Sequence, residues 1–220
     1  MTRRLVVGIL KGGAGKSTTA SQMAVWMALL GQGPILVGDA DTDQTSFEWV
    51  MSVREKLLAA GGGDTARIDA VDLTAGRTRR LHDLERNYRY SVVDVEPKRE
   101  ELLREALRQP KRDERTDLII PIKPYPADVR KLPQTIALAK EVDQHNPVFP
   151  RALLVQVRLS ASHATDFPKT LDEAGIPRFK TMIKLKESIG YSLNTTFVDE
   201  AYADVLAELG ITGGPSTGKE

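Results

Sequence analysis

Short runs of apolar residues, each bounded by glycine, proline or charged residues, recur along the whole chain. The runs cover residues 5–10, 34–39, 66–73, 90–95, 117–122, 152–157 and 179–183. A short apolar run between turn residues is typical of a strand buried inside a sheet, on both of its faces. The pattern therefore predicts seven buried strands.

Apolar residues spaced three to four apart predict helices between these strands. In residues 17–30, Met23, Met27 and Leu30 share one face, and Gly31 is a typical C-terminal stop. Further helices are predicted from residue 96 to before Pro110, over 127–142 and over 199–209. The alternation predicts an α/β fold, a doubly wound, mostly parallel twisted sheet with helices on both faces. We expect a single domain over 1–210 and a disordered tail over 211–220.

Composition narrows the possible chemistry. The 31 basic and 30 acidic residues give a formal net charge of +1, so any site for a polyanion must be a local patch. The chain has no cysteine, which excludes disulfides, thiolate metal sites and iron–sulfur clusters. It also lacks a run of 18 apolar residues that could cross a membrane. These features predict a cytoplasmic protein without a membrane partner.

A glycine-rich loop follows the first predicted strand and precedes the first predicted helix. Its residues are Lys11, Gly12, Gly13, Ala14, Gly15, Lys16, Ser17 and Thr18. Glycines let backbone N–H groups turn inward around phosphate oxygens, and the helix start adds its positive dipole end. Lys16 can then neutralise β- and γ-phosphates, while Ser17 offers its hydroxyl to Mg²⁺. The standard phosphate loop has a glycine at the position of Leu10, so the strict pattern is not met.

Lys11 lies at the loop entrance, where its side chain can point away from the phosphates that its own loop surrounds. The segment KGGAGKS resembles the deviant Walker A motif of ParA/MinD-type ATPases, which are dimerising P-loop ATPases. In that family the first lysine crosses a two-fold interface to the partner's nucleotide. The resemblance implies ATP and Mg²⁺ as ligands and a homodimer across ATP. It also implies hydrolysis of ATP to ADP and phosphate, with Lys11 and Lys16 as catalytic residues.

Carboxylates follow two of the predicted strands. The letters GDADTDQ resemble the family's D-x-D-P-Q segment, which implies that Asp41 orients the attacking water and contacts the magnesium shell. The proline is missing here, so Asp43 takes this role if the alignment shifts. The run YSVVD resembles the Walker B strand, which implies that Asp94 holds Mg²⁺ through water. Ser17, Asp41 and Asp94 are therefore the predicted metal-binding residues. Arg158 lies where relatives often contact adenine.

Other features favour one branch of this family, the short ParA plasmid or chromosome partition ATPases. The lack of cysteine argues against nitrogenase-reductase-like members. The last predicted helix is acidic, which argues against a MinD-like basic membrane helix. The resemblance implies an ATP-bound dimer that binds DNA non-specifically and associates with the nucleoid. A ParB-like centromere-binding partner would stimulate ATP hydrolysis, and hydrolysis would reset the DNA-bound dimer.

The segment 178–186 is the predicted DNA contact. Its basic residues are Arg178, Lys180, Lys184 and Lys186. They would contact phosphates without reading bases. The same residues can instead be a solvated strand end. Two other functions stay open: ATP-dependent positioning of a protein cargo, and a metabolic amidoligase or synthetase of the same P-loop class. Lys11 argues against the second, because those enzymes generally lack the entrance lysine.

Overall fold

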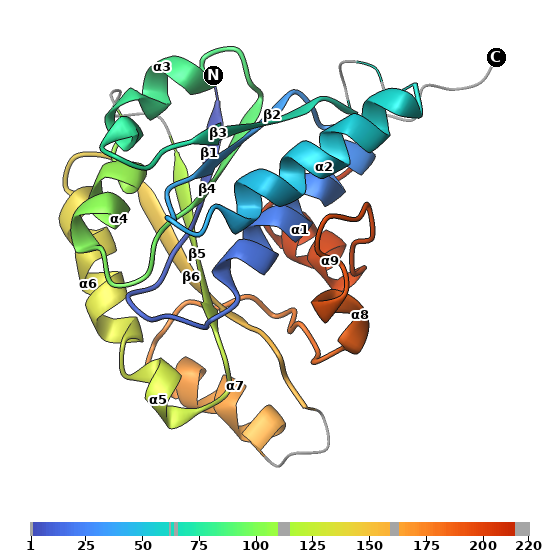
Figure 1. The fold of residues 1–220 in the computed structure, drawn as a ribbon. Helices are drawn as coiled ribbons and strands as arrows, with labels where there is room; N and C mark the ends of the chain where they lie inside the picture. Colours follow the sequence, from blue (N-terminus) through green and yellow to red (C-terminus); the bar gives the residue numbers. More distant parts are fainter. Residues whose placement is uncertain (1, 62, 64–65, 110–114, 159–162, 214–220) are drawn as a thin grey trace.

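A six-stranded parallel sheet forms the centre of the molecule (Figure 1). The computed structural model describes residues 2–61, 63, 66–109, 115–158 and 163–213. The strands are β1 (Arg3–Val7), β2 (Ile35–Asp39), β3 (Ile68–Asp72), β4 (Tyr90–Asp94), β5 (Thr116–Ile122) and β6 (Val148–Leu154). Their order is β3-β2-β4-β1-β5-β6, and every neighbouring pair is parallel. The predicted doubly wound α/β fold is confirmed.

Helices cover both faces of this sheet (Figure 1). On one face lie α1 (Lys16–Leu29), α2 (Thr45–Ala59), α8 (Glu187–Gly190) and α9 (Ala201–Glu208). On the other lie η2 (Arg77–Arg80), α3 (Leu81–Glu85), α4 (Glu100–Leu107), α5 (Pro126–Val129), α6 (Leu132–Asp143) and α7 (His163–Glu173). Successive strand residues point to opposite faces, so Leu5 and Val7 of β1 enter one core and Val6 enters the other. Both faces of the strands are buried, which explains their continuous apolar runs.

Residues 179–183 do not form the predicted seventh strand. The segment runs beside β6, where the amide of Phe179 bonds to the carbonyl of Ala152 at 2.9 Å, but only isolated bridges form. The next two amides, of Lys180 and Thr181, donate instead to the Glu208 carboxylate at 2.9 and 2.8 Å. A side chain therefore takes the place of a strand partner and interrupts the ladder.

The predicted helix over 127–142 is two helices, α5 and α6. Pro133 lies in the first turn of α6, where its missing N–H removes no helical hydrogen bond. The helix predicted from residue 96 begins at Glu100. The chain was also expected to be disordered from 211, yet Ile211 is buried in the core and Thr212 accepts a bond from Gln32. Residues 214–220 of that predicted tail lie outside the described residues.

Candidate functional site

The loop between β1 and α1 lies at the carboxyl end of the sheet, where parallel sheets place their ligand sites (Figure 1). Leu10 occupies the position of the missing glycine and is 5% exposed within the core. Its side chain therefore anchors the loop entrance. Gly13 and Gly15 have φ angles of 71° and 79°, which other residues adopt only with strain. The glycines are needed for the backbone path of the loop.

The start of α1 has the features of an anion site. Gly15 is its N-cap, no side chain caps the helix, and its first turn holds no acidic residue. The N–H groups of that turn are therefore available to an anion. A Cβ added at Gly12 or Gly13 would meet no atom within 4 Å, so the space beside the loop is open. Lys16, the first residue of α1, is 6% exposed, which places its charge in a shielded position.

Asp94 ends β4 as a fully buried carboxylate. Its Oδ2 accepts a hydrogen bond from Ser46 at 2.7 Å, while its Oδ1 has no partner among the described residues. Burial, and then the charge of Asp39, raises the pKa of Asp94 to about 7, although bonds from Ser17 and Ser46 and the charge of Lys16 oppose the rise. A buried carboxylate oxygen without a partner, next to the Ser17 hydroxyl, suits a bound cation.

The three aspartates at the carboxyl end of β2, Asp39, Asp41 and Asp43, have different surroundings. Asp39 is buried and its two oxygens accept bonds from the amides of Asp41 and Phe47, both at 2.9 Å, so it holds the loop in place. Burial raises the pKa of Asp39 above its usual range. Asp41 is half-buried, and its Oδ1 accepts from the amide of Asp43 at 3.2 Å. Asp43 is exposed. Asp41 is thus the more shielded of the two candidate hydrolytic carboxylates.

The residues that could donate ligands suit a Mg²⁺ ion that is also held by substrate phosphates, and they do not form a dedicated all-protein metal site. No group of three or more histidine, aspartate or glutamate side chains converges on a metal position in the described part of the chain. Mg²⁺ is commonly held by one or two protein ligands together with substrate phosphates and water. Asp94 and the nearby Ser17 hydroxyl provide such a sparse set beside the loop.

Lys11 makes an ion pair within its own subunit. Its Nζ contacts Oδ1 of Asp128 on α5, while Oδ2 of Asp128 accepts from the amide of Lys123 at 3.2 Å. The Asp128 side chain is 4% exposed and that of Lys11 is 33% exposed. The entrance lysine is therefore engaged by a carboxylate of its own subunit.

A cavity of about 140 Å³ opens beside the phosphate loop. Gly15, Thr18 and Thr19 form one wall, and Gln156 and Tyr202 contribute to the others. The buried Tyr202 hydroxyl lies 3.4 Å from the Thr19 hydroxyl, and burial raises the pKa of Tyr202. Arg158, which was expected to contact adenine, is exposed and does not line this cavity.

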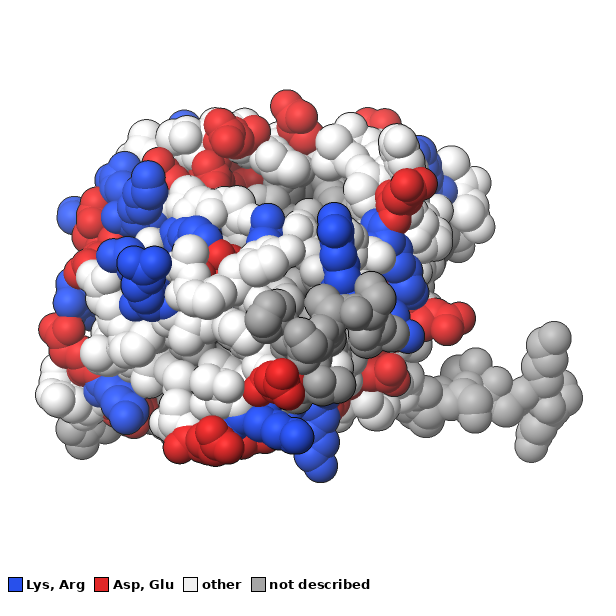
Figure 2. Space-filling model, turned by 90° about the horizontal axis from the view of Figure 1, so that it is seen from below, with Lys and Arg blue, Asp and Glu red and all other residues white. Residues whose placement is uncertain are grey.

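The predicted DNA segment is only partly available. Asp172 binds Arg178 through two hydrogen bonds of 2.8 Å, and the buried Asp199 pairs with Lys186 at 2.5 Å. Lys180 and Lys184 are exposed. Another basic run, residues 77–80, forms the short helix η2, in which Arg77 pairs with Asp72 and Arg79 with Glu105. Figure 2, which views the molecule of Figure 1 from below, shows basic and acidic side chains interspersed, without a large area of one sign.

Two residues at the site escaped the sequence analysis. Ser46 bonds to Asp94 across 48 positions and Asp128 pairs with Lys11 across 117 positions, and the sequence assigned a site role to neither. For Asp128 the signal was its position in a short helix after a proline-rich turn. Ser46 follows the aspartate-rich loop and gave no signal of its own.

The fold and the loop define a ParA/MinD-type ATPase. The chain belongs to the ATPase MipZ family, because that family's model matches residues 3–121, more than half of the chain. No curated protein sequence matches the chain at a significant level.

Several solved structures share the fold. A plasmid partition protein from Borrelia burgdorferi has a TM-score of 0.63 at 18% identity, over 94% of this chain and 99% of that one. A complex of ATP with a McdA variant from Cyanothece has a TM-score of 0.60 at 18% identity, over 96% and 91%. Cobyrinic acid a,c-diamide synthase from Mycobacterium smegmatis, with an ATP analog and magnesium, has a TM-score of 0.61 at 20% identity, over 99% and 100%. At these identities the likeness concerns the fold.

Proposed function

We propose that this protein is an ATPase that binds ATP and Mg²⁺ at the loop between β1 and α1 and dimerises across the nucleotide. The observation that carries the proposal is the uncapped start of α1, with Lys16 beside it and the unpartnered Asp94 oxygen nearby. Gly12 to Thr18 would surround the phosphates with backbone donors. The 140 Å³ cavity beside Thr19 is then the place for the base or ribose.

Ser17 and Asp94 are the residues that would hold magnesium. Bound there, the ion would neutralise charge on the β- and γ-phosphates. Lys16 would hold the same phosphates as a positive charge within its own subunit. Ser46 keeps Oδ2 of Asp94 occupied, so that Oδ1 is the oxygen directed to the ion or its water.

Lys11 would act in the partner subunit. In the monomer it is paired with Asp128, so crossing to the partner's phosphates requires that this pair break. The gain is a cation placed on the γ-phosphate of the other nucleotide, as an arginine finger does in other NTPases. Asp41 would orient the attacking water. Hydrolysis of ATP would then be the step after which the dimer dissociates.

ATP trapped between two subunits stabilises the dimer by linkage and doubles any DNA-binding surface. Lys180 and Lys184 are the exposed members of the segment 178–186 and would contact DNA phosphates. A ParB-like partner would stimulate hydrolysis and release the protein from DNA. In this proposal the protein works in the cytoplasm, and its ATP form associates with the nucleoid.

The test compares the wild-type protein with Lys16→Ala and with Lys184→Glu/Lys180→Glu. Mass measurement in solution and DNA retention are recorded with ATP, with ADP and without nucleotide. We expect a dimer and increased DNA retention with ATP only. Lys16→Ala should lose both, and the double variant should lose retention while keeping the dimer. A wild-type protein that stays monomeric with saturating ATP would refute the proposed dimer.

A metabolic synthetase is the second candidate, because the chain shares its fold with a synthase and has a cavity beside the phosphate loop. Such an enzyme needs no charge from a neighbouring subunit. Lys11→Ala would then leave ATP turnover unchanged. A dimeric ATPase that uses Lys11 in trans would lose hydrolysis with this substitution and keep nucleotide binding. Positioning of a protein cargo would give an ATP-dependent dimer without DNA retention.

A further inference from the structure

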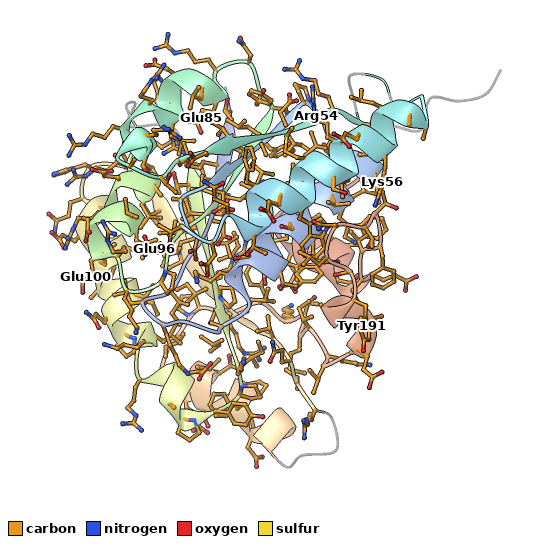
Figure 3. All side chains as sticks on the ribbon, in the orientation of Figure 1. Arg54, Lys56, Glu85, Glu96, Glu100 and Tyr191 are labelled. Atoms are coloured by element: carbon orange, nitrogen blue, oxygen red, sulfur yellow. The ribbon has the colours of Figure 1, made fainter. Side chains whose placement is uncertain are left out.

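A larger cavity, of about 490 Å³, lies at the end of the sheet opposite the phosphate loop, where η2 and α3 approach the end of α4 beside the beginning of β1. Its walls include Arg4, Arg79, Glu105, Arg108 and Gln109. Figure 3 labels Glu85 of α3 at the upper end of the molecule and Glu100, the first residue of α4, lower down. This cavity shares no lining residue with the one beside the phosphate loop. A ligand here therefore needs neither ATP nor the dimer of the proposed function.

The turn that follows α4 is held from two sides. From the sheet, Nη1 of the buried Arg4 donates to the carbonyl of Ala106 at 3.0 Å and to the carbonyl of Arg108. From the other side, Oδ1 of Asn146 accepts from the amide of Gln109 at 3.3 Å. The backbone that carries the side chains of Arg108 and Gln109 is therefore fixed, while neither of these hydrogen bonds uses their side chains.

Positive charge exceeds negative charge around this cavity. The Arg4 guanidinium pairs with the buried carboxylate of Glu85 through Nε, at 3.1 Å, and through Nη2. Arg79 pairs with Glu105 at 3.2 Å, but its side chain is 80% exposed, and an ion pair so open to solvent contributes little. Arg108 is exposed and has no ion-pair partner within the described ranges. The guanidinium of Arg108 is therefore available to an anionic group.

Gln109 is a buried residue whose side-chain hydrogen-bonding groups are unused. It is 5% exposed, and neither its Nε2 nor its Oε1 has a hydrogen-bond partner among the residues that the structure describes. A buried amide without partners lowers stability, and such groups are rare in folded proteins. Because this amide has no hydrogen bond to lose, it can turn into the cavity that the residue lines. A ligand that satisfies it must offer both a donor and an acceptor.

We propose that this cavity binds a short acidic peptide segment of another protein. A carboxylate of the peptide would pair with Arg108, whose planar guanidinium suits bidentate contact. A neighbouring peptide group would satisfy the Gln109 carboxamide, because its N–H donates to Oε1 and its C=O accepts from Nε2. A simple carboxylate ion offers acceptors alone and would leave Oε1 without a donor. The ligand is therefore a carboxylate next to a peptide group, which is the chemistry of an acidic peptide.

The test measures binding of a fluorescein-labelled peptide of alternating glutamate and alanine residues to the full chain, by anisotropy and without nucleotide. Arg108→Gln should weaken binding about 10-fold or more, since a hydrogen bond to a charged group is lost. Gln109→Met keeps the length of the side chain and removes the amide. It should weaken binding about 3- to 10-fold and raise Tm by about 2–4 °C. Arg130→Gln is the matched control, because Arg130 is also exposed and lacks an ion-pair partner in the described part of the chain.

Each outcome decides the proposal. Absence of binding by the wild-type protein, or equal affinity of wild type and Arg108→Gln, would overturn it. A Tm of Gln109→Met below that of wild type would also overturn it, because the amide would then be bonded within the protein in solution. Displacement of the labelled peptide by glutarate as readily as by unlabelled peptide would show that carboxylates alone are recognised, against the proposal. Lys16→Ala should bind the peptide like wild type, which separates this proposal from the proposed function.

Discussion

Replacing Lys11 by alanine should destabilise the monomer without nucleotide, although Lys11 lies in a surface loop. The substitution removes the ion-pair partner of Asp128, whose side chain is 4% exposed. The remaining contact of that carboxylate is the amide of Lys123 at 3.2 Å. A buried charge that loses its partner costs about 3–5 kcal/mol when the pair is fully buried. One third of the Lys11 side chain is exposed, so we expect about 2 kcal/mol.

For a domain of this size, about 2 kcal/mol corresponds to a decrease in Tm of about 4–8 °C. Asp128→Asn is the matched variant, because it removes the charge and keeps an oxygen for the amide of Lys123. It should cost less than Lys11→Ala, and the double variant should be no less stable than Asp128→Asn alone. Thermal unfolding of the nucleotide-free protein measures all three. If Lys11→Ala melts within 1 °C of wild type, on the order of the error, the two side chains do not pair in solution.

Three further substitutions test other parts of the site. Asp94→Asn should stabilise the nucleotide-free protein at pH 8 by about 2–4 kcal/mol. The reason is that burial raises the pKa of Asp94 to about 7, so that ionisation of this carboxyl in the folded protein lowers the stability as pH rises from 4 to 7. Urea unfolding at pH 5 and pH 8 checks this, and a gain that is equal at both pH values would contradict it. Asp41→Ala should slow ATP hydrolysis and prolong the ATP dimer in a phosphate-release assay; an effect in Asp43→Ala alone would move the assignment by two residues. Gly38→Ala should cost about 1–3 kcal/mol in urea unfolding, because the new Cβ would lie 2.4 Å from Cδ1 of the buried Leu73. An unchanged urea midpoint would show that Leu73 can move aside.

The strands were predictable because a strand buried on both faces requires an uninterrupted apolar run. Six of the seven predicted runs are strands. The exception is 179–183, where the Glu208 carboxylate binds the amide of Thr181, 27 positions away in the chain. No local pattern contains that contact. Helix α2 was missed because its buried face is short, with Trp49, Val50 and Val53 among polar residues.

The site was predictable in its local part only. The glycine loop and the strand that ends in Asp94 are each defined by a few adjacent residues, so the sequence was sufficient to propose them. The pairing of Lys11 with Asp128, and of Arg178 and Lys186 with carboxylates, depends on which helices fold against the loop. Those pairings change the interpretation of the lysine and of the DNA segment, and they follow from tertiary structure alone.

Glu208 also protects one side of the sheet. A free edge strand offers a row of N–H and C=O groups on which another chain can add a strand, and this is a common route to aggregation. Beside β6, the amides of Lys180 and Thr181 are already bonded to the Glu208 carboxylate. This side of the sheet therefore cannot be extended by an added strand at these positions. Two copies that associate here must do so through side chains, which allows the contact to be made and dissolved without unfolding either sheet.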